Sequence, residues 1–133
     1  MLKKIFIIED DVNVLYSLQA KFSLNGFQVK TNSGNSVIQE LIDEVKKFKP
    51  DYVILDLILP KVDGFEIIKA LKTEKETASS HIFVFTNLSD EDSRTRGIDL
   101  GAEQYFFKVD FGIDEFVEKV KKIIENKSRI GTN

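Results

Sequence analysis

The chain has 133 residues, of which 42% are hydrophobic and 31% charged, so it is long and apolar enough for one packed domain. It has no cysteine, which excludes disulfides and thiol catalysis, and one histidine, which cannot build a multi-histidine metal site. The net charge of −3, without a long basic block, argues against direct nucleic-acid binding. The first apolar run stops at Glu9, too short for a signal peptide, and no segment approaches a membrane span. We therefore expect a cytoplasmic protein that binds neither nucleic acid nor membrane.

Apolar periodicity predicts five strands that alternate with five helices. The strands are expected at 3–8, 27–31, in the run 52–60, at 82–85 and at 104–107. The helices are expected at 12–24, at 36–48, from 64 to the polar loop 74–80, from about 89 to 100, and at 113–126. Strict alternation predicts one α/β domain over residues 1–126, with a parallel sheet covered by helices on both faces, and a polar tail at 127–133.

Turn and cap signals mark the element ends. Asn25-Gly26 is expected to end the first helix, and Pro50 prevents the second from continuing. The segment 89–92 resembles a capping box that begins at Ser89. The helix that follows is poor in apolar residues, so we expect it to be weakly held and able to serve as a contact surface.

Polar side chains stand at the ends of four of these strands. Asp56 interrupts the third apolar run, Glu9 and Asp10 follow the first, Thr86 follows the fourth and Lys108 follows the fifth. A lone Asp after a strand is more often a cap than a reactive group. If the strands are parallel, however, all these groups converge on the sheet edge where α/β proteins bind ligands.

Such a cluster has a definite chemistry. Carboxylates this close repel one another unless a cation compensates them, and oxygen ligands without His or Cys suit Mg²⁺. Lys108 and the Thr86 hydroxyl can bind a phosphoryl oxygen, and Asp56 can act as a carboxylate nucleophile. Because no His, Arg or Ser is placed as a second catalyst, the site favours acceptance of a phosphoryl group over a full turnover cycle.

In these motifs the chain resembles the receiver domains of two-component response regulators. The matching segments recur in family order to about residue 126: 7–11, 56–60 with Asp63-Gly64, Thr86, Gly101-Ala102 with Tyr105, and Lys108. The resemblance implies a doubly wound, five-stranded parallel sheet of order 2-1-3-4-5, which places the first and third strands side by side.

The resemblance also implies a role for each acidic residue. Asp56 matches the phospho-acceptor, Asp10 the direct Mg²⁺ ligand, and Glu9 the acid that holds the metal through water. The backbone carbonyl of Ile58 matches the remaining protein ligand. Asp11 fits less well, and we interpret it as the residue that starts the first helix.

Three further positions match the phosphoryl-binding and switching residues of the family. Thr86 and Lys108 match the pair that binds the phosphoryl group. Tyr105 matches the aromatic switch that turns inward when the Thr hydroxyl is drawn toward the phosphate. Plain core filling is the alternative for Tyr105, because aromatic residues are so often buried.

The chain departs from the family at two positions. Val109 follows Lys108, where most receivers have a cis proline; because a cis bond before another residue costs about 3 kcal/mol, we predict a trans bond. Asn87 stands where the family has a small residue, and its side chain could narrow access to the phosphoryl group. Ile58 and Leu88 are apolar and flank the site, so we predict slow self-dephosphorylation.

The leading functional hypothesis is a stand-alone receiver, which is not an enzyme beyond its own phosphorylation and dephosphorylation. A sensor histidine kinase or a histidine phosphotransfer protein would phosphorylate it. It would then bind a separate downstream protein through the fourth helix, fifth strand and fifth helix, with homodimerisation as a further possibility. The main alternative is a phosphorylation-independent interaction module on the same fold. A small phosphatase and a flavodoxin-like electron carrier rank lower.

Overall fold

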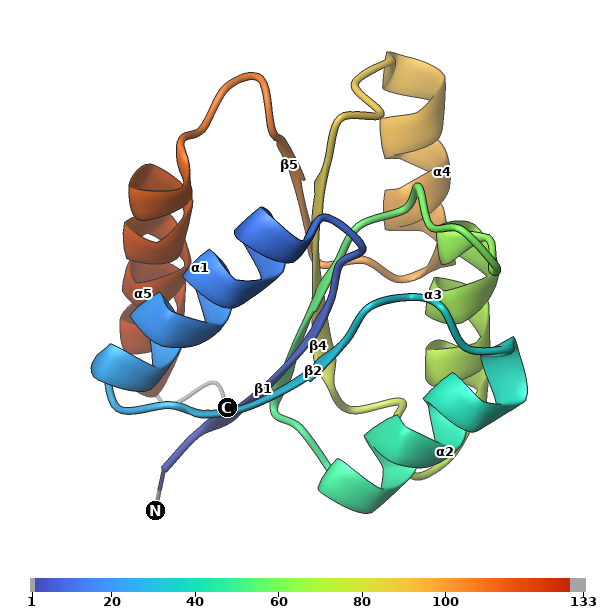
Figure 1. Cartoon of the computed structure of the whole chain (residues 1–133), viewed down its shortest axis with the longest axis horizontal. Coiled ribbons are helices and arrows are strands. Elements are labelled where there is room, and N and C mark those ends of the chain that lie inside the picture. The colour runs from blue at the N-terminus through green and yellow to red at the C-terminus, as the bar shows by residue number, and fades with distance from the viewer. Residues whose placement is uncertain (1, 130–133) are drawn as a thin grey trace.

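The computed structural model describes residues 2–129, which form a doubly wound α/β domain (Figure 1). The five strands are β1 (Lys4–Ile8), β2 (Gln28–Asn32), β3 (Tyr52–Leu55), β4 (His81–Thr86) and β5 (Gln104–Phe107). All are parallel in the order β2-β1-β3-β4-β5, which confirms the predicted sheet. The helices are α1 (Val12–Leu24), α2 (Ile38–Phe48), α3 (Gly64–Thr73), α4 (Glu91–Leu100) and α5 (Ile113–Arg129).

Helices cover the sheet from both sides. Figure 1 shows α1 and α5 on one side of the sheet and α2, α3 and α4 on the other. Alternate residues of β1 follow this division, since Ile5 and Ile7 pack in the core under α1 and α5, and Phe6 and Ile8 in the opposite core. The central strands are therefore buried on both faces, which is why they read as continuous apolar runs.

The element ends agree with the sequence analysis to within a few residues, with two corrections. Helix α5 continues to Arg129, so the predicted end at 126 was wrong and residues 127–129 are helical; the last four residues of the expected tail lie outside the described residues. An ion pair of 2.6 Å between Lys127 Nζ and Glu103 Oε2 ties this last part of α5 to the start of β5. The N-cap of α4 is Asp90, whose carboxylate accepts from Ser93 N–H, and not Ser89.

Helix α4 has little apolar surface, as predicted. Gly97 is its one buried residue, and a methyl group at that position would lie 3.1 Å from the ring of Tyr105. The glycine therefore lets α4 come close to the aromatic ring of β5.

Candidate functional site

The carboxyl ends of the central strands form the site. Asp56 directly follows β3, and Glu9 directly follows β1, whose last residue Ile8 is paired with Leu55. Thr86 ends β4, and Lys108 follows β5. Since parallel strands end at the same edge, residues that are up to 99 positions apart meet there.

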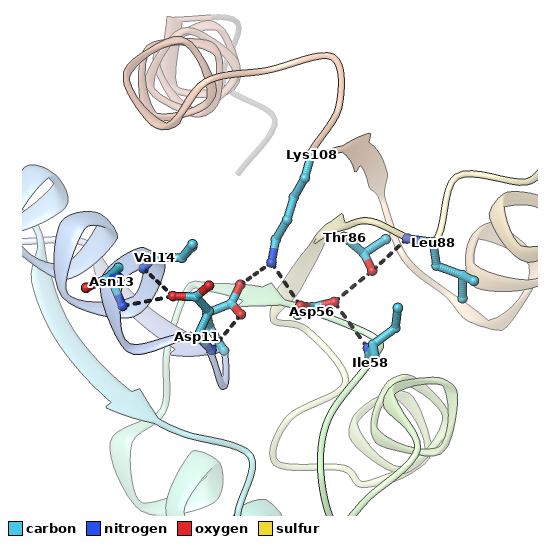
Figure 2. Close-up of polar contacts among 9 residues, drawn as sticks. Asp11, Asn13, Val14, Asp56, Ile58, Thr86, Leu88 and Lys108 are labelled. Carbon is cyan, nitrogen blue, oxygen red and sulfur yellow. Dashed lines mark hydrogen bonds and ion pairs between the residues drawn. The ribbon is translucent and has the colours of Figure 1, made fainter.

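Asp56 lies at the centre of this edge, with only 6% of its surface exposed. Its Oδ1 atom accepts hydrogen bonds from the Thr86 hydroxyl (2.7 Å) and from the backbone N–H of Ile58 (3.1 Å). Its Oδ2 atom accepts from Lys108 Nζ at 2.9 Å. Figure 2 shows Lys108 and Thr86 reaching the carboxylate from different elements. The carboxylate is thus buried, oriented and partly neutralised.

Lys108 also binds the second buried carboxylate. Its Nζ atom lies 2.8 Å from Glu9 Oε1, and the backbone N–H of Asp11 donates to Glu9 Oε2 at 3.1 Å. Burial raises the pKa of Glu9 to about 7 against the opposing effect of Lys108, and the charge of Asp56 adds to the rise. Burial lowers the pKa of Lys108, but its hydrogen bonds to Glu9 and Asp56 outweigh burial, so that pKa is raised. The amine therefore stays charged and holds two acids that repel each other.

The acids form a cluster that fits a hard cation. Carboxylate oxygens of Glu9, Asp10 and Asp56 all lie within 4.8 Å of one another, and Asp10 is exposed to solvent. Oxygen ligands of this kind, with one acid open to water, match the preferences of Mg²⁺. Ile58, whose carbonyl was the fourth expected ligand, lies in the adjoining loop and forms an isolated bridge with Asp63.

A chain of hydrogen bonds leads from Asp56 to Tyr105. The Thr86 hydroxyl accepts from the backbone N–H of Leu88 at 3.2 Å, and the Leu88 carbonyl accepts from the Tyr105 hydroxyl at 2.6 Å. Tyr105 is only 8% exposed, and burial together with nearby Asp90 and Asp56 raises its pKa to about 12. The phenol therefore remains a proton donor, and its ring occupies the inward position.

The structure tests two of the smaller predictions about the loops. Asp11 is the N-cap of α1, since its carboxylate accepts from the N–H groups of Asn13 and Val14, as expected of a residue that starts a helix (Figure 2). The bond between Lys108 and Val109 is trans, also as predicted, and Val109 is 73% exposed. The amine of Lys108 reaches Asp56 without a cis bond.

Two features of the site were not predicted. The pairing of Lys108 with Glu9 was missed, although both residues were assigned to the same sheet edge. Leu88 was singled out for its apolar side chain, whereas its main chain connects Thr86 with Tyr105. A main-chain contact leaves no mark in residue type, so no signal in one sequence points to it.

Comparison with known proteins identifies the family. Residues 5–121 match the family model described as the response regulator receiver domain. Because the match covers most of the chain, the chain belongs to this family, and the predicted class is confirmed. Receiver domains are signalling domains of two-component response regulators.

The relatives include longer regulatory proteins. The chain is 29% identical over 96% of its length to the DNA-binding dual master transcriptional regulator RpaA of Synechocystis, and covers 51% of that protein. It is 32% identical over 93% of its length to the alkaline phosphatase synthesis transcriptional regulatory protein PhoP of Bacillus subtilis, and covers 49% of it. The chain thus spans about half the length of these relatives.

A solved structure shows the same fold. The BeF3-activated DrrB receiver domain is 27% identical, with a TM-score of 0.78 over 94% of this chain and 99% of that one. None of the helices in residues 2–129 combines the length and the hydropathy needed to cross a membrane.

Proposed function

We propose that this receiver domain accepts a phosphoryl group on Asp56 from the phosphohistidine of a sensor histidine kinase or a histidine phosphotransfer protein. The observation that carries the proposal is the convergence of Lys108 and Thr86 on the two oxygens of the buried Asp56 carboxylate. Family membership supports the same reaction class. We place this reaction in the cytoplasm.

In the transfer, one oxygen of Asp56 attacks phosphorus, an O–P bond forms, and the N–P bond of phosphohistidine breaks with its electron pair returning to the imidazole. Lys108 and the Thr86 hydroxyl then move from the carboxylate to the phosphoryl oxygens, because the negative charge now lies on those oxygens. Glu9, Asp10, Asp56 and the carbonyl of Ile58 would hold Mg²⁺. When bound, the ion compensates the negative charge of the carboxylates and the phosphoryl group.

The same residues provide a readout. When the Thr86 hydroxyl turns to the phosphoryl group, its hydrogen bond with the Leu88 N–H changes. The loop that contains Leu88 then moves, and the Leu88 carbonyl, which accepts from the Tyr105 hydroxyl, moves with it. We propose that this alters partner binding on the face formed by α4, β5 and α5, either to a downstream protein or to a second copy of the chain. Catalysis is limited to the domain's own phosphorylation and dephosphorylation.

The stand-alone status is part of the proposal. The matched relatives are transcriptional regulators about twice as long as this chain. An immunoblot of the native protein tests this status. A band at the mass of this chain indicates a receiver that signals to a separate protein, and a band at about twice that mass indicates a receiver joined to an output domain.

The test of phosphorylation is intact-mass measurement after incubation with acetyl phosphate and Mg²⁺. We expect one added phosphoryl group on the wild type, none on Asp56→Asn, and none after chelation of the metal. Asp110→Asn, which removes an exposed acid from the loop after β5, is the matched control and keeps the modification. Modification of Asp56→Asn would contradict the proposed acceptor.

The alternative is a phosphorylation-independent interaction module. Its support comes from Val109 and Asn87, which differ from the family pattern. With the trans bond, Lys108 still reaches Asp56, so Val109 does not remove the amine from the site. Failure of acetyl phosphate and of histidine kinases to modify the wild type would favour this alternative.

A further inference from the structure

An open groove lies beside the Asp56 site. It runs between the loop 57–63 and helix α4, has a volume of about 520 Å³, and is completed by Phe65, Leu88 and Arg96. Figure 2 shows the side chains of Ile58 and Leu88 on the side of Asp56 that faces away from Asp11. We refer to this feature as the loop–α4 groove.

The floor of the loop–α4 groove is aliphatic. Ile58 is 53% exposed, and Leu59, Val62 and Leu88 are half-buried. Four aliphatic side chains from two separate loops thus line one continuous surface beside a charged site. Covering such a surface releases water and stabilises a complex by about 25 cal/mol per Å² of apolar area.

The wall of the groove carries unpaired positive charge. The guanidinium of Arg96 lies 4.1 Å from the centroid of the Phe65 ring, and among the described side chains it pairs with no carboxylate. Lys61 is exposed and also lacks an ion pair among these side chains. The one acid of the lining, Asp63, uses its carboxylate to cap α3 through the N–H of Phe65. The groove therefore presents cations that lack a partner.

The contact with the Phe65 ring also restrains the Arg96 guanidinium. An arginine held against a ring has fewer conformations to lose when a carboxylate binds it, and its N–H donors remain available to that carboxylate. Arg94, two residues earlier, instead lies near Glu91 (4.0 Å) and over the ring of Phe107. The two arginines of α4 thus contact different surfaces, Arg96 the groove and Arg94 the ring of Phe107 in β5.

We propose that the loop–α4 groove binds an extended segment of a partner protein, which places an aliphatic side chain on Ile58 and Leu88 and a carboxylate on Arg96. The combination of an aliphatic floor with a pre-oriented arginine fits a peptide that has an acid next to a Leu, Ile or Val. Charge complementarity favours this partner over a basic segment.

Occupation of the groove is coupled to Asp56. The backbone N–H of Ile58 donates to Asp56 Oδ1 at 3.1 Å, and that of Leu88 donates to the Thr86 hydroxyl at 3.2 Å. Both loops that form the floor thus bond to groups that change partners when Asp56 is phosphorylated. By linkage, phosphorylation changes the affinity for the segment by the same factor by which the segment changes the phosphorylation equilibrium. This coupling rests on the proposed function, whereas the groove itself does not.

The binding test uses a library of random linear peptides displayed on phage and selected on the full, unphosphorylated chain. We expect the enriched peptides to place Asp or Glu next to an aliphatic residue. In fluorescence anisotropy with an enriched peptide, Arg96→Ala and Ile58→Lys should each raise Kd at least tenfold. Arg94→Ala is the matched control and should stay within twofold. Circular dichroism checks that each variant is folded.

Enrichment of no common pattern, enrichment of peptides without an acid, or equal effects of Arg94→Ala and Arg96→Ala would each overturn the groove proposal. A second arm compares the Kd of the peptide for the phosphorylated and the unphosphorylated wild type, and equal Kd values overturn the coupling. Failure of phosphorylation itself contradicts the proposed function. The peptide-binding measurements on the unphosphorylated chain would still test the groove proposal.

Discussion

The hydroxyl of Tyr105 donates a hydrogen bond of 2.6 Å to the main-chain carbonyl of Leu88. This bond joins β5 to the loop after β4, and Leu88 N–H is in turn bonded to the Thr86 hydroxyl. One residue of the loop thus contacts both the residue beside Asp56 and the aromatic ring under α4. The position of Tyr105 depends on that loop and on the space that Gly97 leaves.

Replacing Tyr105 with Phe tests the hydrogen bond between the Tyr105 hydroxyl and the Leu88 carbonyl. The change removes the donor to the Leu88 carbonyl but keeps the ring, so we expect the free energy of unfolding to fall by about 1 kcal/mol. Urea denaturation measures it. Tyr16→Phe, at an exposed position of α1, is the control and should change nothing. Equal losses in the two variants would show that the Tyr105 hydroxyl bond does not stabilise the fold.

Replacing Gly97 with Ala tests the space under α4. Alanine favours a helix over glycine by about 1 kcal/mol, but its methyl group would lie 3.1 Å from the Tyr105 ring. Overpacking of this kind costs about 1–3 kcal/mol, so we expect a net loss of stability and a shift of the Tyr105 ring resonances in NMR spectra. The exposed Thr95→Ala in the same helix controls for helix propensity. If Gly97→Ala left the ring resonances unmoved and raised the stability, α4 would be able to shift away from the Tyr105 ring without an energetic cost.

The ion pairs at the opposite end of the sheet predict a pH dependence. Glu103 Oε1 lies 2.7 Å from His81 Nδ1, and its Oε2 lies 2.6 Å from Lys127 Nζ. Burial raises the pKa of Glu103, but the hydrogen bonds with Lys127 and His81 outweigh burial and hold that pKa below its usual 4.5. The stability from this lowered pKa is therefore present above about pH 4.5 and is lost as the pH falls through the folded-state pKa.

Lys127→Met isolates this contribution from those of other acids. We expect the difference in free energy of unfolding between wild type and Lys127→Met to be largest near neutral pH and to shrink below about pH 4.5, in urea titrations at a series of pH values. Lys122→Met, an exposed position of the same helix, should show no such trend. A difference that stayed constant with pH would mean that Lys127 acts only through packing.

The fold could be predicted because its local and global signals agree. Strands β1 and β3 are buried on both faces, so each reads as an apolar run, and alternation with amphipathic helices leaves few topologies. The convergence of the site residues could be predicted for the same reason, since Glu9, Asp56 and Lys108 each directly follow a strand and parallel strands end at the same edge. The convergence of these residues follows from the parallel strands together with the strand order that the family resemblance implies.

What could not be predicted depends on tertiary contacts. Helix α5 continues past residue 126, where Lys127 pairs with Glu103, a residue 24 positions earlier in the sequence. Ser89 and Asp90 are both good N-cap residues, and in the structure it is the Asp90 carboxylate that caps α4. The link through Leu88 uses main-chain atoms that every residue carries.

The apolar residues beside Asp56 predict a long-lived phosphorylated state. Ile58 and Leu88 flank the carboxylate from two loops, and neither side chain can orient a hydrolytic water. Given phosphorylation of Asp56, we expect replacement of both residues with Asn to speed self-dephosphorylation about tenfold, a change of about 1.4 kcal/mol in the barrier. Loss of the phosphorylated mass with time measures the rate. Leu24→Asn, at an exposed aliphatic position at the end of α1 that lies away from the site, is the control for added surface polarity. Unchanged dephosphorylation in the double variant would show that water reaches the acyl phosphate by a route these side chains do not cover.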